Sequence, residues 1–233
     1  MVIYNSLIDR IKEILPSDIK KLDYKKTAVV KGNKNDIIFA RDSAYELGGS
    51  VLPCVSTLAV SSDKVFSDCS YLLGKDIYEI KQDVPFGKIV FLQIEDISDD
   101  DKAFDKIKEL EFVRYSFIAK DFMPRVSALS MREQIRVGKN AVRNRISFAD
   151  YGSALIDEYK KNPIVKSVEI YFLTDFNHFD ELNALAEKVK NTTSALNHIL
   201  DNVIFDCSSC NLKEICDEVD GMKDLHMKAN GIK

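Results

Sequence analysis

The sequence predicts a mixed α+β fold, with α/β layers of helices and strands packed around a common core. Of the 233 residues, 45% are apolar, which is enough to bury a substantial core. Some segments carry apolar residues at helical spacing, whereas others are short, continuous runs rich in β-branched residues. The two kinds of segment are interleaved along the chain without a short internal repeat, which favours a layered architecture over a repeat protein.

Helices are predicted where apolar residues recur every three or four positions. In the first of them Ile3, Leu7 and Ile11 share one face, and the helix ends before Pro16 because proline cannot continue a helix. A later one ends at Asn162-Pro163 for the same reason. The predicted helices are residues 2–14, 42–47, 129–142, 148–161, 178–190 and 193–202.

Strands are predicted where β-branched and aromatic residues form short apolar runs between turn residues. The polar turn at 32–35 suggests that the two runs flanking it pair with each other. The predicted strands are residues 27–30, 36–40, 55–60, 88–94, 112–118 and 165–173. These assignments divide the chain into an N-terminal helix and appendage (1–35), an α+β domain (36–204) and a cysteine-bearing C-terminal segment (205–233).

Charge and hydropathy restrict the classes of function. The chain has 33 basic and 37 acidic residues, a net charge of −4, which argues against a general nucleic-acid binder. No apolar run is long enough to span a membrane, and charges follow the N-terminus too soon for a signal peptide. We therefore expect a cytoplasmic protein with neither a nucleic-acid nor a membrane partner. The acidic stretch 95–101 is expected to be a solvated loop and not a cation site.

The most specific local pattern is a group of three cysteines near the end of the chain. Cys207, Cys210 and Cys216 have the spacing Cys-x2-Cys-x5-Cys, and thiolates two positions apart converge readily on one metal. His226 lies ten residues beyond Cys216 and is the candidate fourth ligand. The set suits zinc or an iron–sulfur cluster; a redox-active pair, or thiols without a role, are the alternatives.

The remaining cysteines and histidines carry weaker patterns. Cys54 and Cys69 are expected to be small buried residues, since each adjoins an apolar run. His178 and His198 fall on predicted helices without a catalytic partner, so we expect them at the surface or at helix ends. The common phosphate, dinucleotide and metalloprotease motifs are absent from the sequence.

A second pattern is basic. Five of the chain's arginines fall within residues 125–145, and four basic residues there step by four, three and four positions, so a helix would display them on one face. They are Arg132, Arg136, Lys139 and Arg143. Guanidinium groups bond phosphate oxygens in pairs, so this face predicts an anion site for coenzyme A or a similar ligand. The alternative is an exposed face paired with the acidic stretch 95–101.

The order of several segments resembles the middle domain of acetyl-CoA synthase, the partner of carbon monoxide dehydrogenase in the acetyl-CoA pathway. The resemblance covers roughly residues 40–216 and depends on shared order and spacing more than on any single motif. The segments are AYEL (44–47), LGKDI (73–77), the strand 88–94, MREQIRVGKNAV (131–142), FADYG (148–152), VEIYFLTD (168–175) and the cysteine group.

The resemblance implies an arginine-rich α+β domain that receives coenzyme A, followed by cysteines that hold a four-iron four-sulfur (4Fe-4S) cluster. Cys207 and Cys210 match the first two cluster cysteines of the family and Cys216 the third, at a shorter spacing. The family has a cysteine where this chain has His226. The chain lacks the family's Cys-Gly-Cys nickel motif and the domain that contacts carbon monoxide dehydrogenase, so we do not expect it to make acetyl-CoA alone.

Three functions are compatible with these patterns. The first is an acetyl-CoA synthase-like iron–sulfur protein that serves as an accessory, electron-transfer or assembly component and binds an anionic ligand. The second is a subunit of a split acetyl-CoA synthase or related acyl-transferring complex. The third is a structural or interaction protein whose cysteines bind zinc or no metal.

Overall fold

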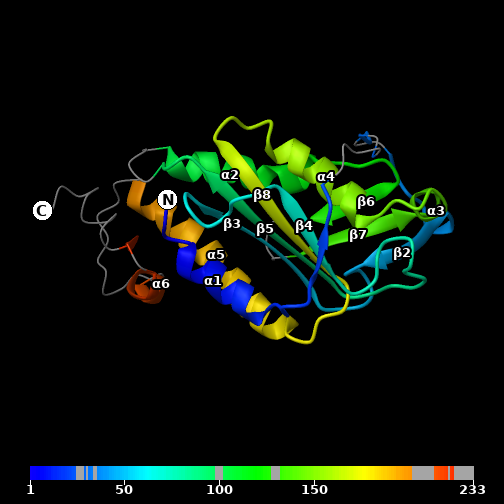
Figure 1. Ribbon diagram of the computed structural model, residues 1–233, viewed down its shortest axis with the longest axis horizontal. Helices are drawn as coiled ribbons and strands as arrows, with labels where there is room; N and C mark the ends of the chain where they lie inside the picture. The colour runs from blue at the N-terminus through cyan, green and yellow to red at the C-terminus, as the bar shows by residue number, and fades with distance from the viewer. Residues whose placement is uncertain are drawn as a thin grey trace, which may run out of the picture.

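The computed structural model confirms a mixed α+β fold built on two sheets (Figure 1). It describes residues 1–24, 29, 31–33, 36–97, 102–126, 132–200, 213–219 and 221–222, with the backbone alone for 197–200. No helix in these ranges is both long and apolar enough to cross a membrane.

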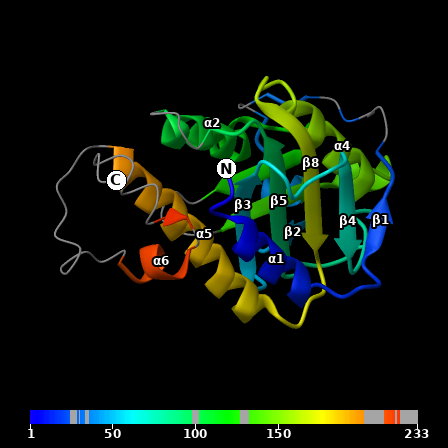
Figure 2. The same ribbon diagram turned by 60° about the vertical axis from the view of Figure 1, so that its left-hand side comes forward.

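The larger sheet has five strands in the order β1-β4-β8-β5-β3 (Figure 2). They are β1 (Lys20–Leu22), β3 (Cys54–Ser61), β4 (Cys69–Leu73), β5 (Phe86–Ile94) and β8 (Val165–Leu173). β3 pairs in parallel with β5, and β4 in parallel with β8, whereas β5 and β8 are antiparallel to each other. The strands β5 and β8 in the middle of the sheet and β3 at its edge are buried on both faces, which explains their continuous apolar sequences.

Helices cover this sheet from opposite sides. Lys12 of α1 (Asn5–Ile14) contacts Glu169 of β8, whereas Gly152 of α4 (Phe148–Tyr159) packs against Phe172 of the same strand. Residues 169 and 172 point to opposite faces because side chains alternate along a strand. α1 and α4 therefore lie on different faces, and the first 22 residues, which contain α1 and β1, contribute to the common core.

The smaller sheet has three antiparallel strands in the order β2-β7-β6. They are β2 (Ser43–Leu47), β6 (Phe122–Val126) and β7 (Glu133–Gly138). The other elements are the 3₁₀ turn Ala40–Asp42 and the helices α2 (Ala103–Ser116), α3 (Lys139–Arg143), α5 (Phe179–Leu200) and α6 (Lys213–Glu218). α5 packs against α1 and β3, and Figures 1 and 2 both show α1 and α5 side by side.

Six predicted elements are confirmed within a few residues of their expected ends. The helices are α1, α4 and the first half of α5, and the strands are β3, β5 and β8. The separate helix predicted at 193–202 is the continuation of α5, which runs unbroken to Leu200. The helices have apolar residues at helical spacing because each buries one face in the core. The strands are continuous apolar runs because they are buried on both faces.

Four predictions are wrong. Residues 43–47 form β2 instead of a helix, and Asp42 ends the 3₁₀ turn before it. Residues 112–116 belong to α2 instead of a strand, because Ala103, Ile107 and Leu110 already set a buried helical face. Residues 36–39 lie outside any strand, and 27, 28 and 30 are outside the described residues. Within the predicted helix 129–142, residues 133–138 form β7, where Ile135 and Val137 alternate with partly exposed neighbours.

Candidate functional site

The segments on which the family resemblance depends meet in space. The Tyr45 hydroxyl donates a hydrogen bond to the Ile77 carbonyl at 2.6 Å, which joins β2 to the loop after β4. The Asp76 carboxylate accepts hydrogen bonds from the backbone N–H groups of Ile77 and Phe148, each at 2.7 Å. These contacts bring three segments, 44–47, 73–77 and 148–152, into one hydrogen-bonded unit.

Asp76 supports the first turn of α4 in this unit. The first N–H groups of a helix have no partner within the helix, and the Asp76 carboxylate satisfies that of Phe148. Ser147 and Asp150 form a reciprocal capping box on the same turn. Burial raises the pKa of Asp76 above its ordinary 3.8, and the two N–H donors oppose that rise.

The loop between β4 and Asp76 approaches the end of β8 closely. Thr174 donates from its backbone N–H to the Leu73 carbonyl at 2.9 Å and from its hydroxyl to the Lys75 carbonyl at 3.0 Å. Gly74 has φ +102°, and a Cβ atom there would lie 2.5 Å from the Thr174 hydroxyl oxygen. Only glycine combines this backbone conformation with so close a contact.

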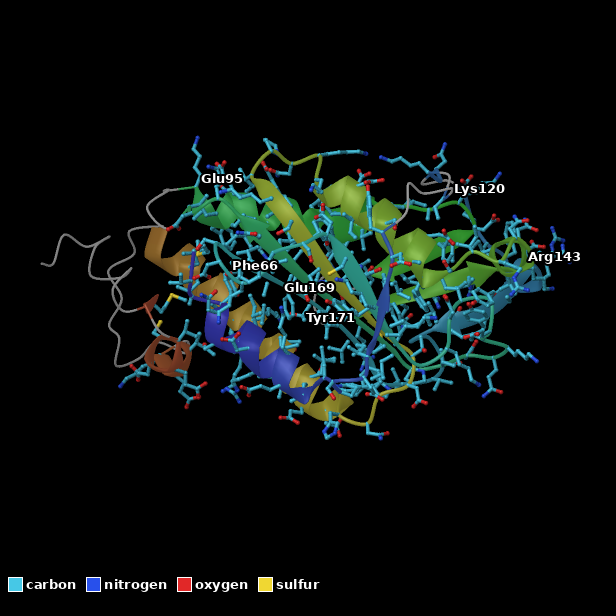
Figure 3. The ribbon with its side chains drawn as sticks, viewed as in Figure 1. Phe66, Glu95, Lys120, Arg143, Glu169 and Tyr171 are labelled. Carbon is cyan, nitrogen blue, oxygen red and sulfur yellow. The ribbon has the colours of Figure 1, made fainter. Side chains whose placement is uncertain are left out.

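The four basic residues expected to share one helix face are distributed differently. Arg132 precedes β7, Arg136 lies within β7, and Lys139 and Arg143 belong to the five-residue α3. Figure 3 shows Arg143 at the outer end of the molecule. The predicted single helical face is therefore wrong, because a strand and a helix orient residues with different periods.

Arg136 is engaged by the protein itself. Its Nε donates to Glu46 Oε1 at 2.8 Å, and its Nη1 donates to the Ile38 carbonyl at 2.9 Å. Arg125 Nη2 donates to the other oxygen of Glu46 at 2.9 Å. Glu46 therefore pairs with two of the arginines and links segments 44–47 and 131–142.

Lys139 and Arg143 differ in their partners. The Lys139 ammonium group donates to the Arg41 carbonyl at 2.6 Å. This acceptor is neutral and exposed, so the positive charge of Lys139 remains at the surface. Arg143 is exposed, and it forms no ion pair with a described residue. These two residues remain candidates for contact with an anion, but they are not aligned with Arg136 as one surface.

Of the predicted metal ligands, only Cys216 lies within the described residues; Cys207, Cys210 and His226 fall outside them. Cys216 is on α6, partly buried and packed against the main core. Ile215 and Val219 on either side of it are buried. Lys188 of α5 forms an ion pair with Glu218, so α6 is held to α5 by both apolar and charged contacts.

The other two cysteines are buried in strands, as predicted. The Cys54 side chain lies against the Gly48 backbone, and the Cys69 thiol donates to the Ser67 carbonyl at 3.7 Å. Within the described ranges, no three histidine, cysteine or acidic side chains are grouped so as to hold a metal. His178 is an exposed residue beside Glu181, as expected, and the His198 side chain is outside the described residues.

A buried ionic group that was not predicted from the sequence lies between the two sheets. Lys88 of β5 forms an ion pair with Glu133 of β7, and both side chains are only 2% exposed. Ser56 donates to the second Glu133 oxygen at 3.0 Å, and Arg114 Nε lies 3.7 Å from it. Burial lowers the pKa of Lys88 despite the neighbouring carboxylate. In the sequence, Lys88 and Glu133 each lie at or near the start of an apolar strand. A charged residue in such a position was the signal that could have indicated this buried pair.

A second polar group lies on the opposite face of the large sheet. Glu169 accepts hydrogen bonds from the Tyr171 hydroxyl at 2.6 Å and from the Lys12 ammonium group at 2.7 Å. Tyr171 stacks on Tyr71 with ring centroids 4.7 Å apart. Figure 3 shows Glu169 and Tyr171 at the centre of the sheet. These contacts attach α1 to the sheet and leave no free nucleophile or acid.

Neither the protein-family models nor the curated proteins contain a match to this sequence. The function of this protein is therefore inferred from its residues and their arrangement.

Proposed function

We propose that this chain is an acetyl-CoA synthase-like iron–sulfur protein, acting as an accessory, electron-transfer or assembly component. The observation that carries the proposal is the network joining the segments of the resemblance. Tyr45 with Ile77, Glu46 with Arg136, Asp76 with Phe148 and Lys75 with Thr174 link five of them. Segments that share order with one family and also meet in space favour the middle-domain fold of that family.

The placement of Cys216 supports a metal site at the C-terminal end. Its helix is anchored on α5 by buried neighbours and by the Lys188–Glu218 ion pair. One thiol is thus held against a rigid element, and Cys207 and Cys210 precede it closely in the chain. Three thiols suit an iron–sulfur cluster or zinc, with His226 as the fourth ligand. A cluster bound there would supply one-electron transfer.

The second and third functions are distinguished by the partner and the metal. A subunit of a split synthase would obtain nickel ligands from another protein, since this sequence has no Cys-Gly-Cys triplet. A structural or interaction protein would contain zinc or no metal. We propose the iron–sulfur protein because three cysteines at cluster-like spacing adjoin the domain on which the resemblance depends.

The test is anaerobic purification followed by a visible absorption spectrum and quantification of iron, nickel, zinc and sulfide. We expect about four irons and about four sulfides per chain. The double variant Cys207→Ser/Cys210→Ser should lose them and keep its thermal unfolding temperature. Cys69→Ser is the matched control, since its thiol bonds only within the core, and it should retain the metal. Zinc without sulfide, or metal retained by the double variant, would refute the proposal.

A further inference from the structure

A polar cavity of about 360 Å³ lies between β1 and the start of α4. Its volume falls within the usual range for small-molecule sites, roughly 300 to 1,000 Å³. Lys20 and Lys21 line one side of it, and Arg145 and Tyr78 line another. The first turn of α4 completes the wall with Ser147, Ala149 and Asp150.

Lys20 and Arg145 are the cations that face this cavity, because Lys20 shares a face of β1 with the buried Leu22, whereas Lys21 lies on the other face. Neither Lys20 nor Arg145 forms an ion pair with a residue that the structure describes, although Lys20 is near enough to Asp76 to oppose the rise in the pKa of that carboxyl group. Arg145 is held in place by Tyr78, with its guanidinium carbon 4.9 Å from the ring centroid. Two positive groups, Lys20 and Arg145, therefore border this cavity without an ion-pair partner at contact distance among the described residues.

The carboxylates in the wall are occupied by the backbone of α4. Asp76 accepts from the N–H groups of Ile77 and Phe148, and Asp150 accepts from the N–H group and hydroxyl of Ser147. They hold the helix instead of pairing with the cations. Asp23, exposed at the rim, is the third acid. The cations thus remain available to a ligand that enters the cavity.

The backbone of Arg145 also has an unusual conformation. Arg145 has φ +52°, in the left-handed region that costs a non-glycine residue free energy. That conformation places its side chain over Tyr78 at the mouth of the cavity. Glycine would adopt this conformation with less strain. The presence of an arginine at this position therefore favours a role for its side chain.

We infer that this cavity binds a small phosphorylated molecule carrying at least two negative charges. A guanidinium group such as that of Arg145 bonds two phosphate oxygens at once, and Lys20 adds a point charge from the opposite wall. The inference is independent of the cysteines, and it locates an anion site away from Arg132, Arg136, Lys139 and Arg143.

The test is titration calorimetry of the full chain with inorganic pyrophosphate, and with citrate as a carboxylate of similar charge. We expect pyrophosphate to bind more tightly than citrate and to weaken as salt is added, because exposed charges are screened. Lys20→Gln should weaken pyrophosphate binding about tenfold, the loss of one charged hydrogen bond. The matched control Lys120→Gln removes an equal charge outside the cavity and should bind as the wild type does.

Arg145→Gly separates binding from folding. Glycine adopts a positive φ freely, so this variant should unfold at an unchanged or higher temperature, yet bind pyrophosphate about tenfold more weakly. Absence of pyrophosphate binding at low salt, equal affinity for citrate, or unchanged affinity in both variants would overturn the inference. Loss of affinity in Arg132→Gln or Arg143→Gln, but not in Arg145→Gly, would return the anion site to the basic residues around α3.

Discussion

The carboxylate of Asp76 accepts a hydrogen bond from the Phe148 N–H group at 2.7 Å, which joins residues 72 positions apart in the chain. The contact fixes the start of α4 against the loop that follows β4. The same loop receives the Tyr45 hydroxyl and the Thr174 hydroxyl. Asp76 is therefore at the centre of the unit that links the segments of the family resemblance.

Replacing Asp76 by asparagine should change how stability depends on pH. Burial raises the folded-state pKa of Asp76 above 3.8, so the folded protein holds this proton more tightly than the unfolded chain does. Wild-type stability should fall as pH rises from about 3.8 to the raised pKa, and level off above it. Asp76→Asn should remove this component and lose about 1–2 kcal/mol at neutral pH through a weaker cap. Urea denaturation at several pH values measures this dependence. If the stability of the wild type and of Asp76→Asn changed with pH in the same way, the raised pKa of Asp76 would be contradicted.

Breaking the Lys88–Glu133 pair from one side should be costly. Glu133→Gln leaves a buried ammonium group without its counter-charge, and we expect a loss of about 3–5 kcal/mol in the free energy of unfolding. Lys88→Met combined with Glu133→Leu should recover part of that loss, because the ammonium group and the carboxylate are then both gone, although Arg114 loses its counter-charge. Urea denaturation of both variants measures the difference. A double variant as unstable as the single one would show that packing, not charge, is responsible.

Arg136→Ala should have a smaller effect that depends on salt. Its guanidinium group and Glu46 are only 22% and 17% exposed, so we expect a loss of about 1 kcal/mol, reduced at high ionic strength. Arg143→Ala is the control, since Arg143 forms no ion pair with a described residue. The loss of stability of each variant is measured by thermal unfolding at two salt concentrations. Equal losses for the two variants would mean that the Glu46 contact contributes nothing specific.

Gly74→Ala should destabilise the loop between β4 and Asp76. The added Cβ would lie 2.5 Å from the Thr174 hydroxyl oxygen and 2.8 Å from the Asp175 nitrogen, at φ +102°. We expect a loss of about 2–3 kcal/mol. Gly221→Ala is the control, because φ there is +82° but the nearest atom to its Cβ is 4.0 Å away. If both variants lose the same free energy, the backbone conformation alone accounts for the effect.

The helices and strands that bury the most apolar surface were predictable from periodicity. β5 and β8 are continuous apolar runs because both faces are covered, and α1 has one apolar stripe because one face is covered. β7 was mistaken for a helix because the pattern from Leu129 to Val142 was interpreted as helical, and Arg132, Arg136, Lys139 and Arg143 were then placed on one face of it. The buried alternation of Ile135 and Val137 was the better indicator, since buried residues and not charged ones reflect the packing.

The candidate sites were only partly predictable for a related reason. The spacing of Cys207, Cys210 and Cys216 is a local property, so the sequence can propose a metal site without the fold. The cavity beside Arg145 assembles residues from β1, the loop after β4 and the start of α4. No local pattern connects these segments, because their proximity depends on the path of the chain.

By itself, the sequence determined the α+β class, the strongest helices and strands, and the set of thiols available for a metal. Each of these follows from composition or from spacing within one segment. Only the tertiary structure decided that Arg136 pairs with Glu46, that Lys88 meets Glu133, and that Asp76 supports α4. Each of those contacts joins segments distant in sequence, and their formation depends on how the sheets and helices pack around the common core.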